Sequence, residues 1–158
     1  MQSDDSFAIK CAATPDVCAL GEEWGQRFIQ EQAIPVISCE GGCFRGEVAR
    51  QAAHLVAQEE PFRRGCHGEM FTVPDSAIAE WMRKAPKVVV IDGCYIHCHG
   101  RVMQNLVEPE RLAIFDALAI FKKHADAIAI DSVPEEERKQ LARQVADSVL
   151  AELRAGAL

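Results

Sequence analysis

The sequence has no run of lysine and arginine, and its formal charge is −7. An acidic surface repels the phosphate backbone, so nucleic acid is not an expected partner. The chain contains no stretch of about 18 apolar residues, which argues against a membrane-spanning helix. Its acidic beginning leads into no apolar segment of signal-peptide length. We therefore expect a soluble, cytoplasmic protein.

The chain also has no internal repeat and no low-complexity segment. Its 158 residues are typical of one compact domain. A domain of this size buries roughly 70% of its unfolded surface, so it needs neither a metal ion nor disulfide bonds to fold. Clear periodicity begins at residue 34, and only residues 22–32 before it show a helical pattern. We predict an N-terminal arm of uncertain structure over residues 1–33 and a cysteine-rich α/β domain over residues 34–158.

Short apolar runs predict buried strands at residues 34–38, 88–91 and 127–130. The unbroken apolarity of the second run indicates burial on both faces, as in a parallel sheet. Helical spacing follows or precedes these runs over residues 46–60, 75–84, 100–106, 112–123 and 135–155. Ser132 and Glu135 have the spacing of a capping box at the start of the last helix. Strands that alternate with helices predict a single three-layer, Rossmann-like domain with a mostly parallel sheet.

The seven cysteines are the most informative residues. In a reducing compartment stable disulfides are rare, and clustered cysteines more often bind metals or act in catalysis. Cys39 directly follows the first predicted strand and Cys94 follows the second, so in a parallel sheet both thiols lie at the edge where ligands bind. Each has a second cysteine four residues on, Cys43 and Cys98, a spacing that brings two thiols within reach of one ion. Cys66, in a glycine-flanked loop, could complete the set.

Several segments together resemble the DGC-domain family, which is described as zinc-binding: Cys39-Glu40-Gly41-Gly42, Gly46-Glu47-Val48-Ala49-Arg50-x2-Ala53, Cys66, and Asp92-Gly93-Cys94-x3-Cys98. The resemblance covers roughly residues 34–107. It implies that the family's four recurring cysteines, here Cys39, Cys66, Cys94 and Cys98, bind zinc, and that Cys43 is a neighbouring thiol. The resemblance implies no particular reaction.

Other polar side chains accompany these cysteines. His67 follows Cys66, while His97 and His99 flank Cys98, and each is either an additional or outer-shell ligand or a polar loop residue. Asp92 either forms a turn or orients a ligand. The sequence leaves open which of Cys43, His67, His97 and His99 joins the site.

Two other chemistries remain alternatives. Five thiols exceed the four positions of zinc, so an iron–sulfur cluster or a thiol redox pair is also compatible with the pattern. Cys39 and Arg45 are spaced as Cys-x5-Arg, which looks like the phosphate loop of low-molecular-weight tyrosine phosphatases and arsenate reductases, with Asp131 as the acid. That interpretation leaves Cys66, Cys94 and Cys98 unexplained. We predict a metal-binding protein with zinc as the first choice, and neither an enzymatic activity nor an oligomeric state is predicted.

Overall fold

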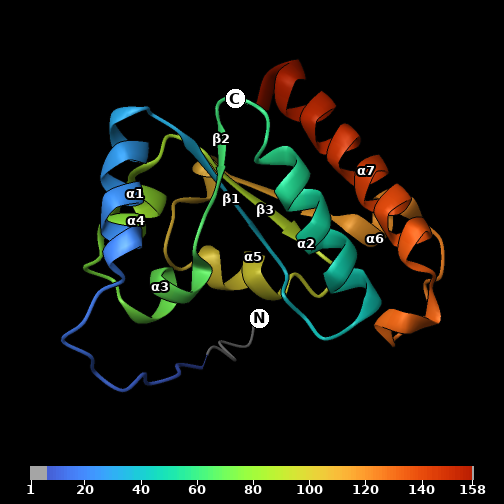
Figure 1. The fold of residues 1–158 in the computed structure, drawn as a ribbon, viewed down its shortest axis with the longest axis horizontal. Coiled ribbons are helices and arrows are strands. Elements are labelled where there is room, and N and C mark those ends of the chain that lie inside the picture. Colours follow the sequence, from blue (N-terminus) through green and yellow to red (C-terminus); the bar gives the residue numbers. More distant parts are fainter. Residues whose placement is uncertain (1–6, 158) are drawn as a thin grey trace, which may run out of the picture.

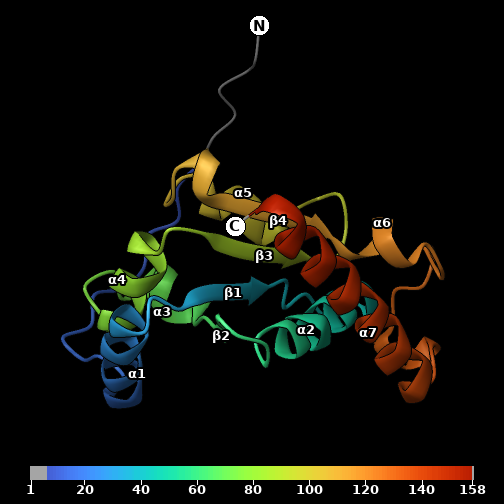
Figure 2. The same cartoon turned by 90° about the horizontal axis from the view of Figure 1, so that it is seen from above.

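The computed structural model describes residues 7–157, which form one parallel sheet covered by helices on both faces. The strand order is β2-β1-β3-β4, as Figure 2 shows from above. The strands are β1 (Ile34–Ser38), β2 (Phe62–Arg64), β3 (Val88–Asp92) and β4 (Leu112–Asp116). Ser38 pairs with Ile91, and Asp92 pairs with Asp116, so the carboxyl ends of β1, β3 and β4 lie together at one edge.

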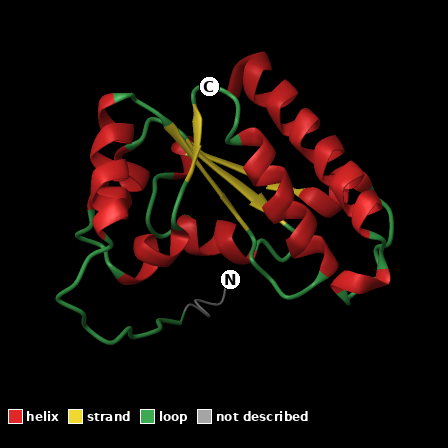
Figure 3. Cartoon of the chain, viewed as in Figure 1, coloured by secondary structure: helices red, strands yellow, loops and turns green. Residues whose placement is uncertain are grey.

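Seven helices are described: α1 (Ala19–Gln30), α2 (Phe44–Val56), α3 (His67–Thr72), α4 (Ala77–Lys84), α5 (Cys98–Met103), α6 (Ala117–Phe121) and α7 (Glu135–Glu152). In Figure 1, α1, α3 and α4 lie on one side of the strands, and α2, α6 and α7 lie on the other. Figure 3 shows the same arrangement by element type, with the strands in the middle. The predicted three-layer α/β architecture is confirmed.

The two central strands explain this layering. All five residues of β1 and of β3 are buried, because each strand presents alternate side chains to a separate hydrophobic core. Val89 and Ile91 pack with α2 and α7, whereas Val88 and Val90 pack with α1 and α4. The unbroken apolar sequence therefore predicted burial on both faces correctly. No helix in the described part of the chain is both long enough and apolar enough to cross a membrane.

Helix α1 packs against α4 and contributes to one of the two cores. The Phe28 ring lies 4.7 Å from the Trp81 ring, and Trp81 Nε1 donates a hydrogen bond of 2.8 Å to the Ala33 carbonyl. Before this helix, residues 7–18 are exposed and run past α3 in an extended path (Figure 1, dark blue). The Cys18 N–H donates to Glu69 Oε1 of α3 at 2.8 Å. The division into an arm and a domain at residue 33 stays a prediction.

Several predicted elements were wrong. Residues 127–130 form no strand: Ile128 is exposed, and a 3-10 turn begins at Ile130. The last strand of the sheet is β4, which forms from the first part of residues 112–123, a segment predicted to be one helix. Strand β2 was not predicted. The capping box is also absent, since Pro134 caps α7 and the Ser132 hydroxyl donates to the Ala129 carbonyl at 2.6 Å. None of these errors falls within the two central strands, since β2 and β4 are the outer strands of the sheet.

Candidate metal centre

The candidate centre lies where the sheet changes direction. The chain passes from β1 outward to β2 and then crosses back to β3, so β1 and β3 are neighbours whose following connections lead to opposite sides. In open α/β sheets such a switch point, at the carboxyl ends of the strands, is the usual place for a ligand. Cys39 follows β1, and its N–H donates to the Ile91 carbonyl of β3 at 3.0 Å. The first thiol is therefore fixed at the switch point by the backbone.

Three potential ligands converge there. One ligand atom each from Cys39, Asp92 and His99 all lie within 4.8 Å of one another. Within residues 7–157 this is the one group of three or more histidine, cysteine or carboxylate side chains gathered so closely. We refer to these three residues as the Cys39 cluster.

Asp92 is the organising residue of the Cys39 cluster. Its side chain is 1% exposed, and its two oxygens accept backbone N–H bonds from His99 at 3.1 Å and from Gly100 at 2.8 Å. The carboxylate thus holds the first turn of α5 against the end of β3. Gly100 makes this approach possible, because a Cβ there would lie 2.9 Å from Asp92 Oδ2. Asp92 therefore accepts backbone N–H bonds as a turn-forming carboxylate does, and the donors belong to α5. That it orients a ligand stays a prediction.

His99 is held by its surroundings with one ring nitrogen unpaired. Nδ1 is buried without a hydrogen-bond partner among the described residues and lies 3.9 Å from Asp92 Oδ1, too far for a hydrogen bond. The His67 ring packs edge-on against the His99 ring at 4.7 Å, and the Phe71 ring is 6.0 Å away. Burial lowers the pKa of His99, so the imidazole favours the neutral form, which is the form that binds metals.

The Cys39 thiol is half-buried and accepts the Gly41 N–H at 3.3 Å. Burial is the main factor that raises its pKa; the N–H groups of Gly41 and Gly93 oppose that effect, and the charges of Asp92 and Cys98 add to it. The protein alone thus disfavours a thiolate at this position. A bound cation would reverse that preference, because coordination deprotonates a thiol.

The other predicted ligands lie around this edge without joining the Cys39 cluster. Cys66 is the N-cap of α3 and is exposed, while Cys98 is the first residue of α5 and is also exposed. Cys94 lies in the loop after β3 and Cys43 is the N-cap of α2, and both are half-buried. All seven cysteines are free thiols, so none is held in a disulfide.

His97 begins α5 in an unusual backbone conformation. Its φ of 50° and ψ of 50° lie in the left-handed region, which is uncommon for a residue other than glycine. Its Nε2 is buried without a hydrogen-bond partner among residues 7–157. The turn at His97 aims the next two residues, Cys98 and His99, back toward the strand ends.

A polar clamp beside the centre was not predicted. Arg64, at the end of β2, donates to the Val36 carbonyl at 2.8 Å and to the Ser38 hydroxyl and Glu40 Oε1, each at 3.1 Å. The buried Ser38 hydroxyl in turn donates to Glu40 Oε1 at 2.9 Å. Since Ser38 and Glu40 flank Cys39, and Arg64 lies two residues before Cys66, the clamp ties two thiol-bearing segments together. Its guanidinium also places a positive charge beside a centre rich in potential thiolates.

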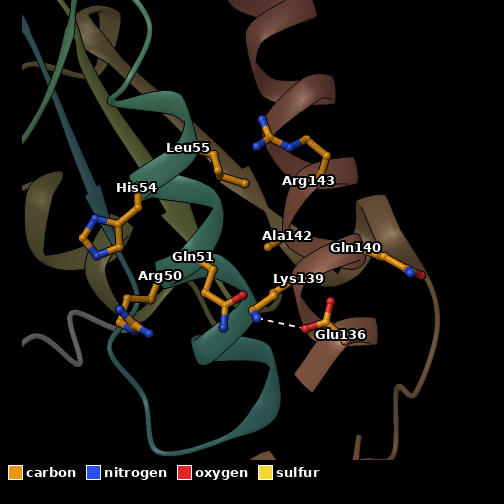
Figure 4. A pocket seen from close by; sticks show the side chains of 9 residues that line it. All are labelled: Arg50, Gln51, His54, Leu55, Glu136, Lys139, Gln140, Ala142 and Arg143. Atoms are coloured by element: carbon orange, nitrogen blue, oxygen red, sulfur yellow. Dashed lines mark hydrogen bonds and ion pairs between the residues drawn. The ribbon is translucent and has the colours of Figure 1, made fainter. Parts of the chain in front are cut away.

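A separate surface groove contains none of these residues. It lies between α2 and α7, and Figure 4 shows side chains from both helices around it. Two of its cations are engaged in ion pairs: Arg50 with Glu47 at 2.7 Å, and Lys139 with Glu136 at 2.9 Å. The groove contains no cysteine and is separate from the candidate centre.

The fold and this edge define a class: a single parallel α/β domain with a cysteine-rich candidate metal centre at its switch point. More particularly, the chain belongs to the DGC-domain family, because the family model for the DGC domain matches residues 35–152. No curated protein and no solved structure matches the chain. The resemblance inferred from short segments is confirmed over most of the chain. Family membership and the Cys39 cluster together support a metal ion as the ligand of this edge.

Proposed function

We propose that this protein binds zinc through thiolates at the carboxyl edge of the sheet, with Cys39, Cys66, Cys94 and Cys98 as ligands and Cys43 close by. The observation that carries the proposal is the Cys39 cluster, which gathers a thiol, a carboxylate and an imidazole within 4.8 Å at the switch point. The other four thiols of the proposal belong to segments that begin or end at the same edge. Zinc is bound in proteins by these kinds of side chains.

The charges at the edge also favour a cation. Asp92 is buried, Glu40 is near, and five cysteines can each become a thiolate, all in a chain of net charge −7. Once deprotonated, these groups would repel one another without a counter-ion. A divalent ion would offset this repulsion, and Arg64 would contribute a further positive charge.

The phosphatase-like alternative is less well supported. A nucleophilic cysteine of that kind needs a lowered pKa. Burial instead raises the pKa of Cys39, and the side-chain charges that act on it, those of Asp92 and Cys98, raise it further. An iron–sulfur cluster remains a second candidate because the same edge carries five thiols, more than one zinc ion requires.

The proposal is tested by purifying the protein without oxygen and measuring its metal content and visible spectrum. We expect about one zinc per chain, the stoichiometry of a single mononuclear site, and no visible absorption band. A brown protein that contains iron and acid-labile sulfide would show that the site holds an iron–sulfur cluster instead of zinc. Protein that carries no metal and does not take up added Zn²⁺ would overturn the proposal; hydrolysis of an aryl phosphate, abolished in Cys39→Ser, would then favour the phosphatase-like reaction.

A double variant separates metal binding from folding. Cys94→Ser/Cys98→Ser should lose zinc but keep its circular dichroism spectrum, because neither side chain belongs to the two hydrophobic cores. The matched control is Cys11→Ser/Cys18→Ser, which changes two exposed thiols near α3 and α1 and should keep the zinc. Equal zinc content in the two double variants would contradict the assignment of Cys94 and Cys98.

A further inference from the structure

His99 has the geometry of a metal ligand, although the cysteine pattern of the family does not include it. We propose that His99 Nδ1 binds the same ion as Cys39, so that the centre combines an imidazole nitrogen with thiolates. This inference rests on the proposed function and deepens it. It assigns a different role to Asp92, which positions His99 and does not bind the ion.

The unpaired ring nitrogen is the first argument. Leaving a buried polar atom without a partner is unfavourable, so such atoms are rare in folded proteins. Nδ1 of His99 is such an atom, and its nearest acidic neighbour, Asp92 Oδ1, is 3.9 Å away and already accepts a backbone N–H. A metal ion shared with the Cys39 thiol would satisfy this nitrogen without moving the carboxylate.

The rigid setting of the ring is the second argument. The His99 backbone N–H donates to Asp92 Oδ1. The centre of the His99 ring lies 4.7 Å from that of the His67 ring and 6.0 Å from that of the Phe71 ring. The side chain is 17% exposed, so packing restricts its rotation. Ligand histidines in metal sites are usually fixed in this way by a surrounding shell.

Charge is the third argument. Four thiolates on a divalent ion leave a net charge of about −2, whereas three thiolates and a neutral imidazole leave about −1. The side chain of Asp92, a member of the Cys39 cluster, is buried and accepts two N–H bonds, as a carboxylate does. The less negative ligand set is therefore favoured next to it. With His99 and Cys39 as ligands, four-coordinate zinc needs two more, so two of Cys66, Cys94 and Cys98 bind the ion and the third lies outside its coordination shell.

The test compares His99→Gln with His54→Gln, a control on the exposed face of α2 outside the centre. In the wild-type protein labelled with ¹⁵N-histidine, added Zn²⁺ should shift one Nδ1 resonance, and that shift should be missing in His99→Gln. Competition with a chromophoric chelator should show that zinc affinity falls at least about tenfold, the lower limit found even when outer partners of a ligand are removed. His54→Gln should match the wild type in both measurements.

Cobalt substitution and a rescue variant distinguish a ligand from a packing residue. With Co²⁺, His99→Gln should change the ligand-field bands but keep the sulfur-to-cobalt charge-transfer band. His99→Cys should restore tight binding and strengthen the charge-transfer band, a result that a packing role cannot produce. Wild-type affinity and an unchanged cobalt spectrum in His99→Gln would overturn this inference and leave the proposed function intact. Failure of the wild type itself to bind Zn²⁺ or Co²⁺ would overturn the proposed function instead.

Discussion

Strands β3 and β4 both end in an aspartate at the same register, but the segments after the two strands differ. Asp92 and Asp116 are paired residues at the ends of two adjacent parallel strands. Each carboxylate accepts backbone N–H bonds from the helix that comes next, α5 for Asp92 and α6 for Asp116. Asp92 is buried and accepts two such bonds, whereas Asp116 is half-buried and accepts one, from Ala119 at 3.1 Å.

The connection between strand and helix accounts for the difference. Helix α6 begins at Ala117, directly after Asp116, so Asp116 is an ordinary N-cap. Five residues, 93–97, separate Asp92 from α5, and they carry Cys94 and the left-handed turn at His97. A strand-end aspartate can therefore take part in a ligand site when the loop after it is long enough to bring potential ligands back beside it.

The largest expected effect comes from Asp92→Ala. Two backbone N–H groups at the start of α5 would lose their charged acceptor, which should cost about 2–4 kcal/mol of unfolding free energy. His99 would no longer be held beside Cys39, so zinc binding should be lost as well. Chemical denaturation and zinc titration of the same samples measure the two effects. A variant that loses no stability and binds zinc normally would contradict the organising role of Asp92.

A smaller effect should follow from Gly100→Ala, which displaces the Asp92 carboxylate without removing it. The added methyl would lie 2.9 Å from Asp92 Oδ2 and 3.0 Å from Ile114, closer than packed atoms tolerate. Overpacking of this kind costs about 1–3 kcal/mol, and the better helix propensity of alanine offsets only part of it. We therefore expect lower stability and weaker zinc binding, measured by thermal unfolding and chelator competition.

Gly68→Ala is the matched control for that substitution, because Gly68 lies in a short helix beside another predicted ligand. The nearest atom to an added Cβ is Cys66 Sγ at 3.9 Å, an ordinary contact. Stability should rise slightly, by about 0.5–1 kcal/mol, since alanine loses less conformational freedom in a helix than glycine. If both alanine variants behaved alike, the close approach of Gly100 to Asp92 would have no part in shaping the centre.

The sequence predicted the central part of the fold better than its borders. β1 and β3 are buried on both faces, so their apolar runs were unambiguous. β2 has three residues, two of them arginines, and is a strand because its backbone pairs with β1. β4 places Leu112 and Phe115 at a spacing that also suits a helix, and its pairing with all five residues of β3 decides the outcome. Long-range pairing of this kind overrides local pattern.

The candidate centre, too, has parts that the sequence predicts and parts that it does not. Sequence order alone placed Cys39 and Cys94 at one edge, because parallel strands must end together. The approach of His99 to Cys39 depends on the backbone conformation at His97, which no residue type in the loop specifies. The clamp by Arg64 depends on β2, which was not predicted, so its contacts with Ser38 and Glu40 had no signal in the sequence.

The smallest expected effect, that of Asp116→Ala, is the most direct test of the comparison. Removing an N-cap costs typically about 1 kcal/mol. Because α6 carries no proposed ligand, zinc affinity should equal that of the wild type. The measurement is sensitive, since α6 does contact the loop after β3: the Leu118 N–H donates to the Gly93 carbonyl at 3.3 Å. Weaker zinc binding in Asp116→Ala would show that the centre depends on the end of β4 too, and that the longer loop after β3 is not what makes Asp92 part of the centre.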